Sequence, residues 1–340
     1  MPDLGYGTNN NHWMVQVQKI FYPLLAAIGI PSNIATFLIL WRKNCKLSAS
    51  SRCYLMAISV ADTLVLILIV VLEMILHYYT TESFWYRQPW CMIRDVFNYG
   101  AYNTSTWLVV GFTIERFIAI TTVQLRTKLC TRRNALYVIA SVFVCSHVCA
   151  IPYLWSNESL KDNSTGHYVC KYSSKVPSCF VEGLVWFQTT LVYIIPYIII
   201  FLLNGLILRQ ICLSNKVHCE RNNLQLQATR RFRSHKRKSV ILLVTVSMTY
   251  AYLCTTRFVT QILIRTLHYG INRRDYLQGI NVAADVGTML DLTHCAVNMY
   301  LYACTQSHFR EELVVCAKAV LYPWKSFEKP REYPLVISEI

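Results

Sequence analysis

The sequence predicts an all-α protein, a bundle of seven transmembrane helices followed by a short C-terminal amphipathic helix. Two observations favour this fold class. Hydrophobic residues make up 54% of the 340 residues and charged residues only 15%, whereas roughly a quarter of the residues of a soluble domain are charged. In addition, long apolar runs alternate with short basic segments, as expected for a chain that crosses a bilayer repeatedly.

Seven apolar runs are long enough to cross the hydrocarbon core, which takes about 20 helical residues. Because lipid cannot satisfy open backbone polar groups, each run is expected to be helical. The runs lie near residues 20–41, 53–77, 90–121, 134–155, 180–209, 239–266 and 277–303. The predicted organisation is therefore an extracellular N-terminus (1–19), a membrane domain (20–303), and an amphipathic helix with a cytoplasmic tail (304–340).

Lys and Arg predict the orientation of these helices. Segments 41–52, 116–133, 209–238 and 304–340 hold 23 of the 33 Lys and Arg residues, which places them on the cytoplasmic side and the N-terminus outside. The net charge of +15 then reflects topology and attraction to anionic lipid headgroups. It does not indicate nucleic-acid binding, because the basic residues are divided among loops that flank membrane helices.

The predicted outer segment 156–179 contains two glycosylation motifs and two cysteines. The motifs begin at Asn157 and Asn163, and both are expected to carry glycans on the outer side. Cys91 also lies outside, at the start of the third run, so three outer cysteines compete for one disulfide. We prefer Cys91–Cys170, with Cys179 as the competitor.

Polar residues inside membrane helices are costly and are therefore candidates for function. Asn33 lies in the first run, Asp62 in the second, Ser105 in the third and Asn298 in the seventh. Hydrogen bonds between helices would be enough to explain the neutral groups, at about 0.6 kcal/mol each. Asp62 requires more, namely a proton, an amide partner or a cation.

The third run ends in "VVGFTIERFIAI", where Glu115 and Arg116 stand together in apolar surroundings. Such a pair can satisfy its own charges at the edge of the bilayer. The interpretation that the residues alone support is a pair of side chains that extend toward water.

The order and spacing of these features resemble the rhodopsin-like G-protein-coupled receptors, over about residues 20 to 317. The matching landmarks are Asn33, Asp62, the spacing of 25 between Cys91 and Arg116, Pro196, "NMYLY" from Asn298 to Tyr302, and Phe309 followed by Arg310. The resemblance implies a multi-pass protein of the plasma membrane that binds an extracellular ligand and activates a heterotrimeric G protein. It also implies that Leu313, Val314 and Ala317 of the final amphipathic helix face lipid.

The resemblance also implies two inner sites. The G-protein switch would consist of Glu115, Arg116, Asn298 and Tyr302. The sodium and water pocket would consist of Asp62, Ser105 and Asn298, and sodium is the only metal or cofactor that the family implies.

Several positions depart from the family pattern. His294 and Cys295 replace the usual Asn and Ser near the sodium pocket, which weakens the case for sodium. Cys254 and Thr256 replace the usual Trp and Pro of the sixth helix, and Met299 replaces a Pro of the seventh. Kinks that proline normally produces are therefore not assured at these places.

The outer half of the predicted bundle contains a candidate ligand pocket. The pocket residues are Asn98, Tyr99, Tyr102, Arg257 and Asp291, with Trp186 and Tyr193 as further aromatic walls and Glu73, Arg94 and Asp95 as nearby charges. Arg257 could clamp a carboxylate through two parallel hydrogen bonds, or it could pair with Asp291 or Glu73. This composition suits a small amino-acid-like ligand or the end of a short peptide.

Two segments narrow the resemblance. "LCTTRFV" and "NMYLYA" are most similar to an orphan receptor group that is associated with sensing aromatic amino acids and small peptides. The alternative function is a seven-helix transporter or channel, although the repeats and interrupted helices typical of transporters are not visible. An enzyme is not indicated, because no nucleophile–base pair or metal cluster stands out in the sequence.

Overall fold

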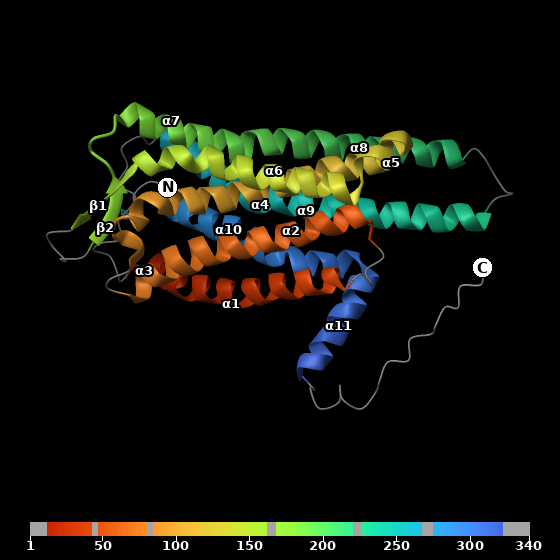
Figure 1. Ribbon diagram of the computed structural model, residues 1–340, viewed down its shortest axis with the longest axis horizontal. Coiled ribbons are helices and arrows are strands. Elements are labelled where there is room, and N and C mark those ends of the chain that lie inside the picture. The colour runs from red at the N-terminus through yellow and green to blue at the C-terminus, as the bar shows by residue number, and fades with distance from the viewer. Residues whose placement is uncertain are drawn as a thin grey trace.

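The computed structural model describes residues 12–42, 47–80, 84–161, 168–219, 226–266 and 275–321. In this part of the chain seven long helical rods run side by side (Figure 1), which confirms the predicted all-α bundle. The rods are α1 (Trp13–Trp41); α2 (Ala49–Val65) continued by the π-helix η1 (Leu66–Ile75) and α3 (Leu76–Tyr79); α4 (Trp90–Thr121); α6 (Arg132–Ala150) continued by the 3-10 helix η3 (Ile151–Trp155); α7 (Ser178–Thr189), the π-helix η4 (Thr190–Ile194) and α8 (Ile195–Cys219); α9 (Leu226–Thr266); and α10 (Gly279–Thr305).

Shorter elements close the two ends of the bundle. At one end lie η2 (Phe84–Tyr86) and an antiparallel hairpin of β1 (Asn157–Lys161) and β2 (Tyr168–Tyr172), and at the other lies α5 (Val123–Leu129) (Figure 1). The helix α11 (Ser307–Leu321) leaves the bundle at an angle at the end opposite the hairpin. We call the hairpin end the outer end and the α11 end the inner end.

Five of the rods are long and apolar enough to cross a membrane. The stretches are Trp13–Trp41, Ala49–Tyr79, Arg132–Trp155, Ser178–Gln210 and Val240–Thr266. The other two rods, α4 and α10, carry 15 of the 31 buried polar or charged residues in the described part of the chain. Since α4 packs against α2, α6, α8 and α9, its polar side chains are shielded from lipid, and hydropathy alone understates it.

The observed helix ends differ from the predicted ones mainly at three places. The fifth rod ends at Cys219 rather than near residue 209. The first helix begins at Trp13 rather than near residue 20, because the His12 ring accepts a hydrogen bond from the backbone N–H of Met14 at 3.2 Å and caps it. The sixth helix begins at Leu226 rather than near residue 239. A helix satisfies its backbone internally whatever its side chains, so it can continue past the apolar run that crosses the bilayer.

The close approach of α9 and α10 positions the outer site. A Cβ added at Gly287 would lie 2.8 Å from the backbone nitrogen of Arg257, so only a glycine permits this backbone contact. Neither helix is interrupted within these bounds. The contact brings Arg257 beside the face of α10 that carries Asp291, one turn further along.

The final helix differs in one respect from the predicted amphipathic helix. Phe309 is buried against Tyr302, with their ring centroids 5.8 Å apart, while Val314 and Ala317 are exposed as predicted. Leu313, however, packs against the bundle core. The prediction that it faces lipid was wrong, because Leu313 lies four residues after Phe309 and so shares its face of the helix.

Candidate functional site

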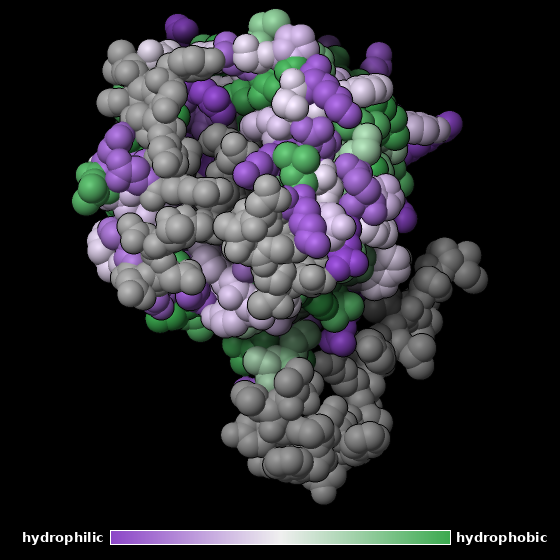
Figure 2. All heavy atoms as spheres, turned by 90° about the vertical axis from the view of Figure 1, so that its left-hand side faces the viewer, coloured by the Kyte–Doolittle hydropathy of each residue, from purple (hydrophilic) through white to green (hydrophobic). Residues whose placement is uncertain are grey.

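A cavity of about 70 Å³ lies among the helices toward the outer end. The structure brings all five predicted pocket residues around it, together with Tyr193. The polar and aromatic residues of its lining include Asp95, Asn98, Tyr99, Tyr102, Gln188, Tyr193, Arg257, Gln261, Thr288 and Asp291. On the outer face above this region, hydrophilic side chains spread over much of the part that is described (Figure 2).

Arg257 and Asp291 form the charged centre of this cavity. The Nε atom of Arg257 lies 3.8 Å from Oδ2 of Asp291, and its guanidinium also donates to the Thr288 hydroxyl. Asp291 accepts a 2.6 Å hydrogen bond from the Tyr102 hydroxyl and a 3.5 Å one from Tyr193. Arg257 was predicted either to clamp a ligand carboxylate or to pair with Asp291 or Glu73. The structure shows the pairing with Asp291. At 3.8 Å this ion pair is longer than a hydrogen bond.

A second acid, Glu73, lies on η1 next to α4. It is only 2% exposed, and its Oε2 accepts a 2.5 Å hydrogen bond from the side-chain amide of Asn98. Glu73 comes from a run of apolar residues, and its partner comes from another helix. The amide supplies a hydrogen bond but no positive charge.

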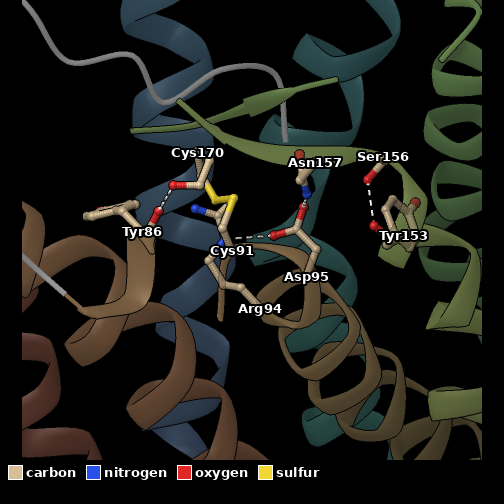
Figure 3. Close-up of a disulfide and its surroundings, with 9 residues drawn as sticks. Tyr86, Cys91, Arg94, Asp95, Tyr153, Ser156, Asn157 and Cys170 are labelled. Atoms are coloured by element: carbon tan, nitrogen blue, oxygen red, sulfur yellow. Dashed lines mark hydrogen bonds and ion pairs between the residues drawn. A yellow bond between two sulfur atoms is a disulfide. The ribbon is translucent and has the colours of Figure 1, made fainter. Parts of the chain in front are cut away.

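A third polar group joins α4 to the hairpin near the disulfide (Figure 3). Nε of Arg94 lies 2.9 Å from Oδ1 of Asp95, and the side-chain amide of Asn157 donates to Oδ2 of Asp95 at 2.7 Å. All three side chains are buried. The carboxylate of Asp95 is therefore held between a guanidinium on its own helix and an amide from β1.

The predicted Cys91–Cys170 disulfide is present and ties α4 to β2 (Figure 3). The competitor, Cys179, is exposed and unpaired. Cys91 is fully buried, so the bond lies beneath the hairpin. This cross-link holds β1 and β2 over the outer end of α4.

The two predicted glycosylation sites have different outcomes. Asn163 lies outside the described residues. Asn157 is 6% exposed and uses its amide nitrogen, the atom that would carry a glycan, to bind Asp95. Glycosylation remains a prediction at both positions, and in the folded chain the position of Asn157 argues against it.

Sequence reasoning missed several polar residues of the cavity and misplaced one aromatic residue. Gln261 and Thr288 line the cavity one turn from Arg257 and Asp291, and Gln188 and Thr189 line it from α7. For Gln261 and Thr288 a signal was present, because each is a polar residue in an apolar helix at helical spacing from a residue already chosen. Trp186 is 40% exposed and does not line the cavity, so its prediction as a pocket wall was wrong: its position on α7 points it outward.

Deeper in the bundle, the three residues of the predicted sodium and water pocket lie in contact. Asp62 is fully buried, and its two carboxylate oxygens accept hydrogen bonds from Ser105 at 2.5 Å and from the side-chain amide of Asn298 at 2.6 Å. Asn33 binds the same part of α10 through the backbone oxygen of Cys295, at 2.7 Å. Groups from four helices therefore converge on this layer of the core.

The predicted switch residues lie in two separate groups. Glu115 and Arg116 form a bidentate pair with both N–O distances at 2.5 Å, and Arg116 also donates to the Ser48 hydroxyl at 3.1 Å. Asn298 is joined to Asp62 rather than to this pair. The buried hydroxyl of Tyr302 has no hydrogen-bond partner among the described residues, so a rearrangement of the inner end could give it one.

Comparison with known proteins agrees with this architecture. The chain matches the model of the 7 transmembrane receptor (rhodopsin family) over residues 32–302. It is also similar to Probable G-protein coupled receptor 142 of Mus musculus, with 23% identity over 328 residues, which is 95% of this chain and 80% of that protein. The family match covers most of the seven rods and both candidate sites. This chain therefore belongs to the rhodopsin family of seven-transmembrane receptors.

Proposed function

We propose that this receptor binds an extracellular ligand with both a carboxylate and an ammonium group, such as an amino acid or the end of a short peptide, and activates a heterotrimeric G protein. The observation that carries the proposal is the cavity lined by the cation of Arg257 and the anion of Asp291, which lie 3.8 Å apart, while the second acid of the lining, Asp95, is paired with Arg94. The carboxylate of the ligand would bind Arg257 and its ammonium would bind Asp291.

The length of the Arg257–Asp291 contact favours a binding role. An optimal charged hydrogen bond measures about 2.7–2.9 Å, so at 3.8 Å each partner can still form a shorter charged hydrogen bond with a ligand group. Tyr99, Tyr102 and Tyr193 supply aromatic surface beside the two charges. An aromatic side chain on the ligand would pack against them.

The proposed orientation has two supports. The basic segments predict that the inner end faces the cytoplasm. The Cys91–Cys170 disulfide lies at the outer end, and disulfides form in oxidising compartments. The same orientation places the Glu115–Arg116 pair at the inner end, where a G protein would bind, and we propose a multi-pass receptor of the plasma membrane.

The test is nucleotide exchange on heterotrimeric G proteins in membranes that contain the receptor, measured against a panel of amino acids and dipeptides. Each active compound is repeated as its methyl ester and as its N-acetyl derivative. A charged hydrogen bond contributes about 1.5–3 kcal/mol, so we expect each blocked form to lose about 10- to 100-fold in potency. Equal potency of blocked and free compounds would contradict the proposed binding mode.

Two substitutions and one control complete this test. Arg257→Lys keeps the charge but loses the planar fork, so it should weaken the response to the free acid and leave the response to the ester unchanged. Asp291→Asn should do the same for the free amine against the N-acetyl form. Arg265→Ala is the matched control, since it removes an arginine from the same helix that does not line the cavity. Ligand-dependent ion or solute flux without exchange would favour a transporter instead.

A further inference from the structure

The pocket around Asp62 differs chemically from a site built for a hard monovalent ion. The ligating atoms of Asp62, His294 and Cys295 all lie within 4.8 Å of one another. The exposed fractions of these side chains are 0%, 4% and 0%. The proposed function uses neither His294 nor Cys295.

Asp62 lacks a permanent positive partner. In the part of the chain that the structure describes, its carboxylate forms no ion pair, and its hydrogen bonds come from neutral groups, those of Ser105, Asn298 and the Cys295 thiol. A buried carboxylate is costly unless its charge is neutralised. The pocket therefore requires a proton or a bound cation.

The donor atoms indicate which cation. Sodium favours hard oxygen ligands, whereas imidazole nitrogen and thiolate sulfur favour softer transition metals, and a mixed set of N, S and O is typical of zinc. Nε2 of His294 lies 3.3 Å from Sγ of Cys295. Two ligands bound tetrahedrally at about 2.05 and 2.3 Å would lie about 3.5 Å apart, so little movement is needed.

A hydrogen bond at Nδ1 leaves His294 in the tautomer that can bind a metal through Nε2. Its Nδ1 contacts the backbone oxygen of Asp291, and because a carbonyl oxygen can only accept, Nδ1 carries the proton. Nε2 is then left with its lone pair on the side of Cys295. Histidine ligands of metals commonly donate their other N–H to a carbonyl or carboxylate in this way.

We propose that Asp62, His294 and Cys295 bind a zinc ion, with a fourth position taken by water or the Ser105 hydroxyl. The Cys295 thiol releases its proton on binding, so a carboxylate, a thiolate and one divalent cation give a neutral site. The ion joins α2 to α10 beside Asn298. It resists relative movement of the two helices at that level.

A second group of possible ligands, Cys254, Asp291 and His294, shares the histidine. It is the weaker candidate for two reasons. Asp291 already faces Arg257 at 3.8 Å, so a divalent ion there would meet a like charge. The nitrogen of His294 that faces Cys254 is Nδ1, at 3.8 Å, and this atom already carries a proton.

The experiment uses the full-length receptor, purified in lipid nanodiscs and stripped of metal with a chelator, without ligand or G protein. Zinc or sodium is added and the unfolding temperature is measured. Cobalt serves as a spectroscopic substitute for zinc, because a cobalt–thiolate bond absorbs in the near ultraviolet. We expect micromolar zinc to raise the unfolding temperature more than physiological sodium does, and cobalt to give the thiolate band.

The variants locate the site. Cys295→Ser should remove the thiolate band and weaken zinc binding. Mutating a residue that only hydrogen-bonds to a metal ligand lowers metal affinity by about 10- to 100-fold, so loss of the ligand itself should lower it by more. Cys254→Ser and the exposed Cys304→Ser are controls that should retain both signals. His294→Asn combined with Cys295→Ser restores hard donors, and its unfolding temperature should respond to sodium rather than zinc.

Two results would overturn the proposal. One is a cobalt spectrum of the wild-type receptor with no thiolate band, which needs no variant to fold. The other is a thiolate band that Cys254→Ser removes, which would assign the metal to the second group. Because no ligand response is measured, neither result bears on the proposed function.

Discussion

The outer and inner halves of the bundle differ in the partners of their charged side chains. In the outer half, acids meet partners from other elements: Asp291 of α10 meets Arg257 of α9, and Asp95 of α4 accepts from Asn157 of β1 besides pairing with its neighbour Arg94. In the inner half, Glu115 pairs with its sequence neighbour Arg116. The Arg257–Asp291 and Asp95–Asn157 contacts exist only when the elements are packed, whereas the Glu115–Arg116 pair requires only α4.

From this difference we expect the outer half to contribute more to stability and the inner half to change conformation more easily. Charges that are paired across helices hold the outer half together, so removing one partner leaves a buried charge behind and destabilises the fold. A pair within one helix at the bundle end can open without separating any helices. The inner half is therefore the part that can change conformation at low cost, and four substitutions test the contrast.

The largest effect is expected from the cross-link of the outer half. Cys91→Ser with Cys170→Ser opens a loop of 79 residues, and the chain-entropy relation gives about 4.5 kcal/mol for a loop of that length. We expect a large fall in the unfolding temperature of the purified receptor. Cys179→Ser is the control and should have no effect, because this cysteine is exposed and unpaired.

Arg257→Ala tests the pairing across α9 and α10. It leaves Asp291 buried without its cation, which costs about 3–5 kcal/mol for a fully buried pair. We expect surface expression to fall, as measured by flow cytometry of an N-terminal epitope. The double variant Arg257→Ala with Asp291→Asn should partly restore it. If Arg257→Ala is expressed normally and the double variant brings no further change, Arg257 is a ligand-binding residue with no structural role.

Asn157→Ala tests the junction between β1 and α4. It leaves one oxygen of the buried Asp95 without its amide donor, at a cost of about 1–3 kcal/mol. Thermal unfolding measures this loss. Ser159→Ala removes the same glycosylation motif but keeps the amide of Asn157, so it should be less destabilising and should not change the mass removed by N-glycosidase. A reduced mass shift in Ser159→Ala would show that Asn157 carries a glycan.

Glu115→Gln tests the inner half and should have the smallest effect on stability. The pair is buried, but the amide oxygen of the new Gln can still accept a hydrogen bond from Arg116, so only the ionic part of the pair is lost. We expect basal nucleotide exchange to rise several-fold, because Arg116 is less restrained. Glu311→Gln on α11 is the control for loss of an acid at the inner end. Unchanged basal exchange at equal surface expression would favour a pair without a switch role.

The sequence predicted the elements of the fold well and its contacts less well. The seven runs became seven rods because each crossing of a bilayer demands a helix of about 20 apolar residues. The pairing of Cys91 with Cys170 was preferred but not decided, since Cys179 also lies outside. The partner of Arg257 was left open among a ligand, Asp291 and Glu73, because no local pattern reports which helix faces which.

Hydrophobic length and the landmark residues therefore determined the fold class and the family from the sequence alone, and the basic loops predict the orientation. They act locally, along one helix or one loop at a time. Only the tertiary structure decided that Asn157 binds Asp95, that Leu313 packs inward, and that His294 and Cys295 meet Asp62. These contacts join residues far apart in the chain, and they depend on how the helices rotate and pack against one another.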